Sequence, residues 1–314
     1  MDEGSLKLGS KNFQKKTNRW KVTLLQKKFI YENLVDKKTL KLKKKLVTKR
    51  NCPCCKKNNS FLFVEKDFFK YLKCNSCSFV YVSPLIKEKD LISIYKNSSY
   101  SNSWGKILSN KTEVKFNENK FLSLLKNINS LKKEKGKILD VGCATGHFLD
   151  ICRKNYWETH GIELNDYERK IAIKKGHTVF KDKIELNYLK KNTYDVVSIL
   201  EVLEHVYNPH KVIKSIKRIL KNNGLLVVIV PNVDSLAANI MQGRCNMFLG
   251  MSHINMFDPI TLKSFIERYS FKEIYKTTIT SELNVINNYL NMQDPYLGNE
   301  LGKNELIKQY NEKN

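Results

Sequence analysis

The sequence of 314 residues contains no long apolar run. No stretch approaches the roughly 18 consecutive apolar residues that a membrane-spanning helix needs. The opening, MDEGSLKLGSKNFQKK, also lacks the apolar core of a secretory signal. We therefore expect a soluble, cytoplasmic protein. Its length allows one well-buried domain of ordinary size and a small additional module.

Arginine is scarce: there are 7 arginines beside 49 lysines, although the formal net charge is +25. Arginine is the residue that nucleic-acid readers prefer for bidentate contacts, so its scarcity weakens the obvious explanation of the charge. The skew is typical of a biased coding composition in which lysine fills solvated positions. Residues 1–50 hold 16 Lys/Arg and 4 Asp/Glu, a net +12. This basic arm either touches an anionic surface or is solvated.

Cysteine is clustered: five of the eight cysteines fall between residues 52 and 77. In an intracellular chain such a cluster indicates metal rather than disulfides. Residues 51–83 are too few to bury a core, so bound metal would supply their folding energy. The fifth thiol, Cys54, is either a bystander or a substitute for a neighbouring ligand. Two C-x-x-C pairs, separated by 18 residues, have the spacing of a closed structural zinc site: Cys52 with Cys55, and Cys74 with Cys77.

From residue 137 onward, strand and helix patterns alternate. Alternation of this kind predicts a doubly wound, parallel, Rossmann-like α/β sheet. Strand patterns lie at 137–141, 159–164, 177–180, 194–202 and 225–232, and helical patterns lie at 146–155, 165–176 and 208–224.

The domain organisation follows from these patterns. Residues 84–136 are mostly helical, interrupted by a Ser/Asn-rich loop at 96–105. We therefore predict four parts: a basic N-terminal segment at 1–50, a zinc-ribbon module at 51–83, a helical connector at 84–135 and a cofactor-binding domain at 136–314.

The glycine turn after the strand at 137–141 reads DVGCATG and begins with Asp140. A triphosphate loop would need Lys-Ser/Thr directly after its last glycine, but His147 follows Gly146. A dinucleotide turn needs G-x-G-x-x-G, and an acid just before Gly142 would repel a pyrophosphate. The turn therefore favours a ligand with positive charge and no phosphate, namely S-adenosylmethionine, which carries a sulfonium and an ammonium group.

A second acid supports this interpretation. Glu163 ends the next strand, 23 residues after Asp140. An acid at the tip of the second strand can accept both hydroxyls of an adenosine ribose. A surface glutamate or an ordinary strand–helix turn would be unremarkable alone, but the two features together predict a cofactor site.

These stretches resemble a known family. ILDVGCATGHFL, GIEL and YDVVSILEVLEHVYNPHKVIKSIKRILKNNGLLVVIVPN are similar to the class I S-adenosylmethionine-dependent methyltransferases. They are most like the branch with the ubiquinone-biosynthesis O-methyltransferases, in which an E-x-L-E-H stretch follows the fourth strand. The resemblance covers about residues 136–275. The cysteine module with FVYVSP resembles the zinc-ribbon leader of many bacterial members.

The resemblance implies roles for particular residues. Glu163 would hold the ribose, Leu164 would flank the adenine, and Leu200 would contact the cofactor near its reacting end. The methionine part of the cofactor would lie against the glycine turn, lined by Asp140, Gly142, Cys143 and Gly146.

The sequence departs from this family in two places. Sugar C-methyltransferases carry a cysteine module with a longer gap between its pairs, which lowers the expectation of C-methylation. The family sheet ends in a hairpin of a sixth and a seventh strand. Residues 271–279 are a candidate sixth strand, but no seventh follows, so that strand is irregular or the chain is a shortened version of a longer protein.

The predicted catalytic residues follow the fourth strand, at the edge where ligands of parallel sheets bind. His205 is a candidate general base, because neutral imidazole can take a proton from a hydroxyl. Glu201 and Glu204 are near enough in sequence to orient it. Alternatively, Glu204 and His205 only cap the following turn. His253 lies in a long connection, 231–257, of the kind that forms lids; it faces the substrate or bonds the loop backbone.

We expect an enzyme that transfers a methyl group to oxygen of a small molecule or glycan precursor. The alternative is a zinc-ribbon nucleic-acid-binding protein, or an RNA methyltransferase, that uses the basic arm. The stretch LEVLEH replaces the Asn/Asp-Pro-Pro-aromatic run of enzymes that methylate amino groups of DNA bases, which counts against that activity. The acceptor and the oligomeric state stay open at this point.

Overall fold

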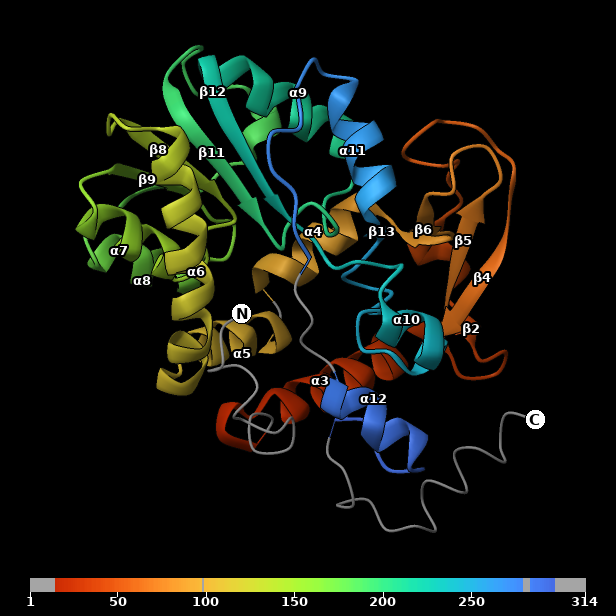
Figure 1. The fold of residues 1–314 in the computed structure, drawn as a ribbon. Helices are drawn as coiled ribbons and strands as arrows, with labels where there is room; N and C mark the ends of the chain where they lie inside the picture. The colour runs from red at the N-terminus through yellow and green to blue at the C-terminus, as the bar shows by residue number, and fades with distance from the viewer. Residues whose placement is uncertain (1–14, 98, 279–282, 297–314) are drawn as a thin grey trace.

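A computed structural model describes residues 15–97, 99–278 and 283–296 of the chain. Figure 1 shows a twisted parallel sheet with helices on both faces and a small antiparallel sheet beside it. Helices from the two ends of the described chain lie below both sheets. Over these three ranges, no helix combines the length and the apolar character needed to cross a membrane.

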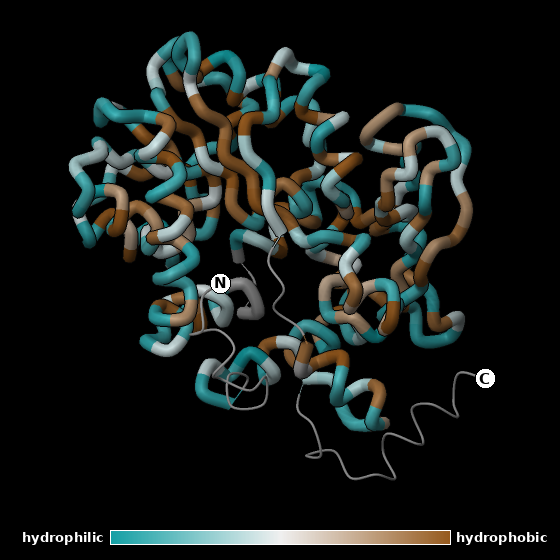
Figure 2. The backbone as a smooth tube through the Cα atoms, viewed as in Figure 1, coloured by the Kyte–Doolittle hydropathy of each residue, from teal (hydrophilic) through white to brown (hydrophobic). Residues whose placement is uncertain are grey.

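The parallel sheet has five strands in the order β10-β9-β8-β11-β12. The central strands are covered on both faces, as in other parallel sheets, and most of their residues are buried. Figure 2 shows these strands coloured mainly as hydrophobic. The predicted doubly wound α/β architecture is therefore confirmed. The strands are β8 (Lys137–Val141), β9 (Glu158–Ile162), β10 (Thr178–Phe180), β11 (Tyr194–Leu200) and β12 (Leu220–Ile229).

Helices cover the two faces of this sheet. On one face, Leu125 and Phe148 pack with Ile138 of β8. On the other face, Ile213 and Phe265 belong to one core with β11. The first face carries α6 (Lys111–Leu131) and α7 (His147–Lys154), and the second carries α9 (Pro209–Ile219) and α11 (Pro259–Glu267); α8 (Asp166–Lys174) connects β9 to β10.

The cysteine module forms an antiparallel sheet that it shares with the parallel-sheet domain. Its strand order is β13-β6-β5-β4. The strands are β4 (Ser60–Lys66), β5 (Phe69–Cys74), β6 (Val80–Val82) and β13 (Asn255–Met256). Because β13 comes from the connection after β12, the end of the segment expected to be a lid pairs as an edge strand with the module.

The N-terminal segment, from residue 15 on, contributes to a hydrophobic core. Val22 and Ile30 are buried with Tyr71 of β5 and Ile286 near the C-terminal end of the described chain. The elements around this core are α3 (Arg19–Phe29), η1 (Ile30–Leu34), α4 (Glu88–Asn97), α5 (Ser99–Leu108), α10 (Leu236–Met241), α12 (Leu283–Leu290) and the short strands β1 (Val35–Asp36), β2 (Lys41–Leu42), β3 (Val47–Thr48) and β7 (Leu85–Ile86).

Three local predictions are wrong. The helix expected at 208–224 ends at Ile219, because Leu220 already pairs with Tyr194 in the sheet. The Ser/Asn-rich stretch 96–105 is helical in its described residues, since Gly105 lets α5 pack closely on Tyr167 and Glu168 of α8. The candidate sixth strand has no strand structure over residues 271–278; residue 279 lies outside the described ranges.

Candidate active site

The glycine turn joins β8 to α7 at the carboxyl edge of the sheet. Gly142 and Gly146 both have positive φ, 78° and 77°, which side chains with a Cβ rarely adopt. A Cβ on Gly142 would also lie 2.4 Å from Cγ2 of Val202. The turn after β8 therefore contacts the turn after β11, and only glycine fits at the contact.

Asp140 lies just below this turn. Its carboxylate is buried and accepts a 2.7 Å hydrogen bond from the Ser198 hydroxyl on the neighbouring strand β11. Burial raises the pKa of Asp140 to about 7, while the bond from Ser198 lowers it. A cationic ligand at the turn would favour the ionised carboxylate, which agrees with the predicted place of the cofactor's methionine part.

Glu163 lies directly beyond the end of β9 and faces the same turn. Its carboxylate accepts hydrogen bonds from the backbone N–H of Ala144 (3.0 Å) and of Asn165 (2.7 Å). Burial raises the pKa of Glu163, and these backbone bonds lower it. A carboxylate has about four acceptor positions, so two remain for ligand hydroxyls. Leu164 follows Glu163 and is partly buried.

The side chain of Cys143 does not face the predicted cofactor site. Its side chain is buried and packs under the turn, where a Cβ on Gly161 would lie 2.4 Å from its Sγ. The thiol therefore points into the protein. The Cys143 backbone is also engaged within the protein, because its N–H donates to the Ile162 carbonyl at 3.0 Å and its carbonyl accepts from Gly146 N–H at 2.8 Å.

The turn after β11 separates the predicted catalytic carboxylates. Leu200 ends β11 and is partly exposed. Glu201 has an exposed side chain that forms a 3.0 Å ion pair with Lys120 of α6. Glu204 is buried, and neither carboxylate oxygen has a hydrogen-bond partner within the described ranges. Burial, together with the charge of Glu201, raises the pKa of Glu204 well above its usual range.

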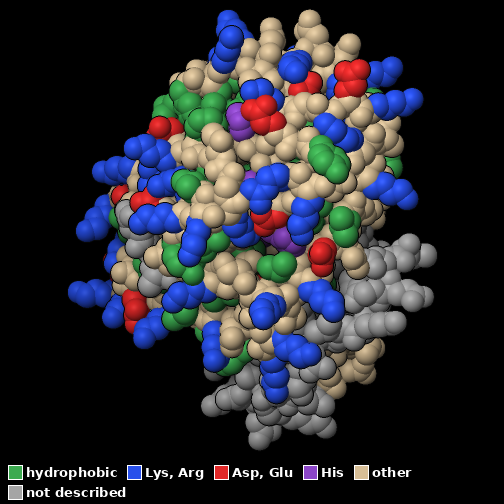
Figure 3. All heavy atoms as spheres, turned by 90° about the vertical axis from the view of Figure 1, so that its left-hand side faces the viewer, with side chains coloured by type: hydrophobic (Ala, Val, Ile, Leu, Met, Phe, Trp, Pro, Cys, Tyr) green, Lys and Arg blue, Asp and Glu red, His purple; other side chains and the backbone are tan. Residues whose placement is uncertain are grey.

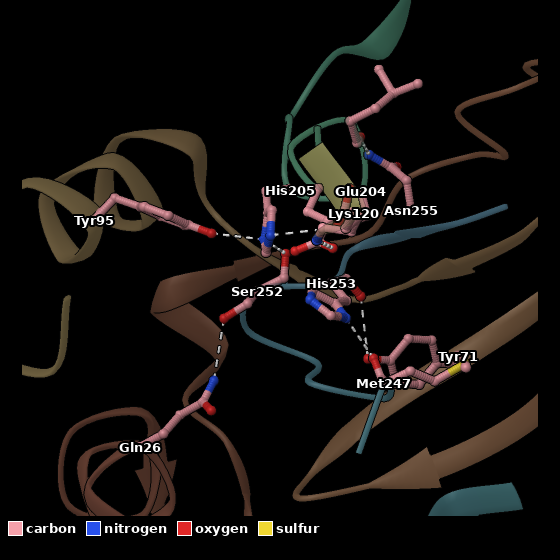
Figure 4. Close-up of polar contacts among 12 residues, drawn as sticks. Gln26, Tyr71, Tyr95, Lys120, Glu204, His205, Met247, Ser252, His253 and Asn255 are labelled. Carbon is pink, nitrogen blue, oxygen red and sulfur yellow. Dashed lines mark hydrogen bonds and ion pairs between the residues drawn. The ribbon is translucent and has the colours of Figure 1, made fainter. Parts of the chain in front are cut away.

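His205 lies beside Glu204 (Figure 4). Its Nδ1 is 2.9 Å from the Ser252 carbonyl oxygen and 2.7 Å from the Tyr95 hydroxyl. A carbonyl can only accept, so Nδ1 carries the proton and Nε2 carries the lone pair. Nε2 is 3.7 Å from Oε1 of Glu204. Burial and the nearby His253 lower the pKa of His205 to about 3, so the ring is neutral at neutral pH.

His253 lies against this pair, although 48 residues separate it from His205. The two ring centroids are 4.8 Å apart. Nδ1 of His253 donates a 2.7 Å hydrogen bond to the Met247 carbonyl, so its lone pair is also on Nε2. Of the two roles considered for His253, the bond to the loop backbone is therefore observed, and contact with the substrate stays a prediction.

The segment that carries His253 is fastened from both sides. Ile254 N–H and Asn255 N–H each donate to the Glu204 carbonyl, at 2.9 and 3.0 Å. On the other side, β13 pairs with β6 of the cysteine module, and the Tyr71 hydroxyl donates to the His253 carbonyl at 3.2 Å. The module thus holds His253 against the turn after β11.

The four cysteines of the two C-x-x-C pairs converge. All four Sγ atoms lie within 4.8 Å of one another. Cys52 and Cys77 are 3.6 Å apart, and Cys55 and Cys74 are 3.5 Å apart. Zinc–sulfur bonds of about 2.3 Å in a tetrahedron separate sulfurs by about 3.8 Å, so the residues fit this ion.

Cys54 lies outside this set of four and anchors the module instead. Its backbone carbonyl accepts hydrogen bonds from Arg268 (2.6 Å) and from Nε2 of His210 (3.1 Å). His210 lies on α9 and Arg268 directly follows α11, and both helices cover the parallel sheet. The first cysteine knuckle is therefore docked on the parallel-sheet domain.

Several residues of the site gave no signal in the sequence. Tyr95 and Lys120 lie in helices with ordinary composition, and Val202 is one apolar residue among many. Only Ser198 could have been found, as a polar residue inside an otherwise apolar strand opposite Asp140. The others depend on contacts between distant segments.

Comparison with known proteins identifies the domain. A family model described as a methyltransferase domain matches residues 115–275, about half of the chain. The chain therefore belongs to this methyltransferase family, and it is an S-adenosylmethionine-dependent methyltransferase. The prediction of enzyme class, from the glycine turn and the acid after the second strand, is confirmed.

Individual relatives match only in part. An uncharacterized protein of Methanocaldococcus jannaschii is 34% identical over 159 residues, which are 48% of this chain and 62% of that protein. A ubiquinone biosynthesis O-methyltransferase of Nitrosomonas europaea is 34% identical over 94 residues, 28% of this chain and 40% of the enzyme. The chain thus spans less than two thirds of the length of these relatives.

Among solved structures, a methyltransferase from Archaeoglobus fulgidus, described as S-adenosylmethionine-dependent, is 22% identical to this chain. The match covers 58% of this chain and 87% of that chain, with a TM-score of 0.43.

Proposed function

We propose that this methyltransferase transfers a methyl group to a hydroxyl oxygen of a small molecule or glycan precursor. The observation that carries the proposal is the contact between Gly142 and Val202. It places the turn predicted to hold the cofactor directly beside the turn that carries Glu204 and His205. The O-methyltransferase among the partial relatives supports oxygen as the acceptor atom.

In this proposal the chain holds the cofactor at the carboxyl edge of β8 and β9. Asp140 neutralises positive charge on the methionine part, and Glu163 accepts bonds from the ribose hydroxyls. Leu164 flanks the adenine, and Leu200 lies near the reacting end. The bound cofactor supplies an activated methyl group on a sulfonium, which departs as a neutral thioether. Gly142 and Gly146, which have no side chain, give it close access to the turn beside Cys143.

The acceptor occupies the space beyond the turn after β11. Nε2 of His205 carries a lone pair and takes the acceptor's hydroxyl proton, while the Ser252 carbonyl holds the ring through Nδ1. Glu204 lies beside Nε2, with its Oε1 3.7 Å from that nitrogen. Glu201, paired with Lys120, lies on the exposed side. Alignment of the acceptor supplies much of the remaining rate.

The cysteine module has a structural part in the proposal. A zinc ion held by Cys52, Cys55, Cys74 and Cys77 has no open position, so it does not activate water. The converging sulfurs support this assignment. Through β6 and β13 the ion would stabilise the position of His253. We also propose that the chain consists of the four parts predicted above, with boundaries after residues 50, 83 and 135.

The nucleic-acid alternative has less support. Figure 3 shows lysine and arginine side chains spread over much of the face it presents rather than gathered in one patch. The N-terminal helix α3 buries apolar residues in a core, so this part of the basic segment is folded structure. Both observations favour solvated lysines over a dedicated docking surface.

The test of the acceptor class uses S-adenosylmethionine with a labelled methyl group. Purified full-length protein is incubated with phenols, sugar nucleotides, lipid precursors and RNA, and labelled products are identified by mass spectrometry and NMR. We expect a methyl ether on a small molecule, formed by the wild type and strongly reduced in Asp140→Asn. Label found only on RNA, or on nitrogen or carbon, would contradict the proposal.

A further inference from the structure

The four converging cysteines, once loaded, would carry negative charge in a poorly solvated place. Four thiolates around one Zn²⁺ leave a net charge of about −2. Cys52 and Cys74 are buried, so water screens this charge only weakly. Buried charges in folded proteins are paired with opposite charges. A cation close to the sulfurs should therefore stabilise the zinc-loaded module.

Arg50 lies beside the core that surrounds these sulfurs. It precedes Cys52 by two residues in the chain. Its guanidinium carbon is 5.7 Å from the centroid of the Tyr81 ring, and Tyr81 belongs to one core with Cys52 and Cys74. The side chain of Arg50 is therefore placed near the thiolates by the fold as well as by the sequence.

The guanidinium of Arg50 is held by carbonyls and has no anionic partner. Nε donates to the Val82 carbonyl at 2.9 Å, and Nη2 donates to the Ile254 carbonyl. Nη1 is buried and lacks a hydrogen-bond partner within the ranges that the structure describes. Over the same ranges, no carboxylate forms an ion pair with Arg50. Because carbonyls carry no net charge, this cation still needs a counter-charge.

The other groups near Arg50 do not supply that counter-charge. Burial raises the pKa of Tyr81 and of Tyr207, so both phenols are neutral at neutral pH. Glu88, a carboxylate near Tyr207, is already paired with Lys183 at 2.7 Å. The zinc-bound thiolates are the remaining candidates in this part of the described structure.

A second arginine approaches the module from the parallel-sheet domain. Arg268 donates to the Cys54 carbonyl at 2.6 Å, but its side chain is exposed, so water screens its charge. Arg50 is only partly exposed, and its fork of donors bonds to two carbonyls at once. Of these two cations, Arg50 is therefore better placed to act on the buried sulfurs.

We propose that Arg50 is a positioning residue for the zinc site: it neutralises part of the charge of the loaded cysteines and fastens them to the segment with His253. The inference rests on the zinc ion proposed above. The Val82 N–H donates at 3.1 Å to the same Ile254 carbonyl that Arg50 binds. Arg50 therefore bonds to both chain segments where β6 meets β13 (Figure 1). Zinc at the cysteines thereby stabilises the contact that holds His253.

The test follows the release of zinc from full-length protein to an excess of a coloured chelator. Arg50→Gln removes the charge but keeps an amide donor, whereas Arg50→Lys keeps the charge without the fork of donors. We expect release at least about tenfold faster in Arg50→Gln, since a nearby opposite charge shifts the pKa of an ionisable group by about 1–3 units. Arg50→Lys should release zinc near the wild-type rate. Arg218→Gln is the matched control, because Arg218 is also partly buried and donates to a carbonyl outside the module, that of Leu189.

The release rates separate charge from tethering. A wild-type rate in Arg50→Gln, or equally fast release in Arg50→Gln and Arg50→Lys, would overturn the role of the charge. If Arg50→Gln folds poorly, the comparison of Arg50→Lys with the wild type decides, and rapid release from Arg50→Lys contradicts the proposal.

Hydrogen exchange of the zinc-loaded proteins measures the fastening. Residues 252–257 should exchange faster in Arg50→Gln than in the wild type or Arg218→Gln, and unchanged exchange there would overturn this part. Cobalt in place of zinc shows through its sulfur-to-metal absorption whether the thiolates bind metal. A wild type that binds neither ion would overturn the zinc assignment together with this inference. Titration of S-adenosylmethionine into the same samples separates either failure from failure of the proposed methyl transfer.

Discussion

Replacing Cys74 with serine is expected to release about one zinc ion per chain and to unfold the cysteine module. Structural zinc contributes about 10–16 kcal/mol in small zinc-dependent peptides. This equals or exceeds the typical stability of about 5–15 kcal/mol of a whole domain. Phe79 and Tyr81 pack near the sulfurs in a core shared with the parallel-sheet domain, so the loss should be largest in the two C-x-x-C turns.

The effect should reach the active site. The module holds the segment with His253 through the pairing of β6 with β13 and through the bond from Tyr71 to the His253 carbonyl. Cys74→Ser should therefore lose methyl transfer as well as zinc, while retaining helical content from the parallel-sheet domain.

Elemental analysis and circular dichroism check this prediction. Cys54→Ser is the matched control, because Cys54 is a neighbouring buried thiol outside the set of four. It should keep its zinc. Full zinc content and a wild-type melting curve in Cys74→Ser would show that the sulfurs hold no structural ion.

Replacing His205 with alanine is expected to lower turnover by about 10²–10⁴-fold, the usual contribution of a positioned proton acceptor. The affinity for S-adenosylmethionine should stay near normal, because His205 lies on the acceptor side and Asp140 and Glu163 remain. Single-turnover kinetics with an acceptor that the wild type methylates measures this loss of rate.

Melting curves and turnover separate the interpretations of His205. If His205 only fastens the turn through Tyr95 and Ser252, the variant melts earlier and still turns over nearly normally once folded. His160→Ala controls for loss of an imidazole. Near wild-type turnover by folded His205→Ala would exclude the role as a base.

The cofactor part of the site could be predicted from the sequence because it is built from local segments. The positive φ of Gly142 and Gly146 and the acid at the tip of β9 follow from short motifs on adjacent elements. Parallel-sheet topology then brings the ends of β8, β9 and β11 to one edge. Little besides the order of strands is needed to place Asp140 near Glu163.

The acceptor side could not be predicted in the same way. His253 reaches His205 only because β13 joins the cysteine module's sheet, a pairing between residues more than 170 positions apart. Likewise, the helix predicted to continue past Leu220 ends before this residue, because Leu220 pairs with Tyr194 in the sheet. In both cases tertiary pairing overrides the local pattern, which a periodicity argument does not see.

The most direct test of the cofactor site is calorimetric titration of S-adenosylmethionine into the wild type, Glu163→Ala and Glu158→Ala. Glu158 begins the same strand but forms an ion pair with Lys137 at the surface, so it is the matched control. The wild type and Glu158→Ala should bind S-adenosylmethionine and its demethylated product, but not NAD. Bonds to a charged acceptor contribute roughly 1.5–3 kcal/mol, so Glu163→Ala should bind at least about tenfold more weakly. Unchanged affinity in folded Glu163→Ala would contradict the assignment of the ribose to this carboxylate.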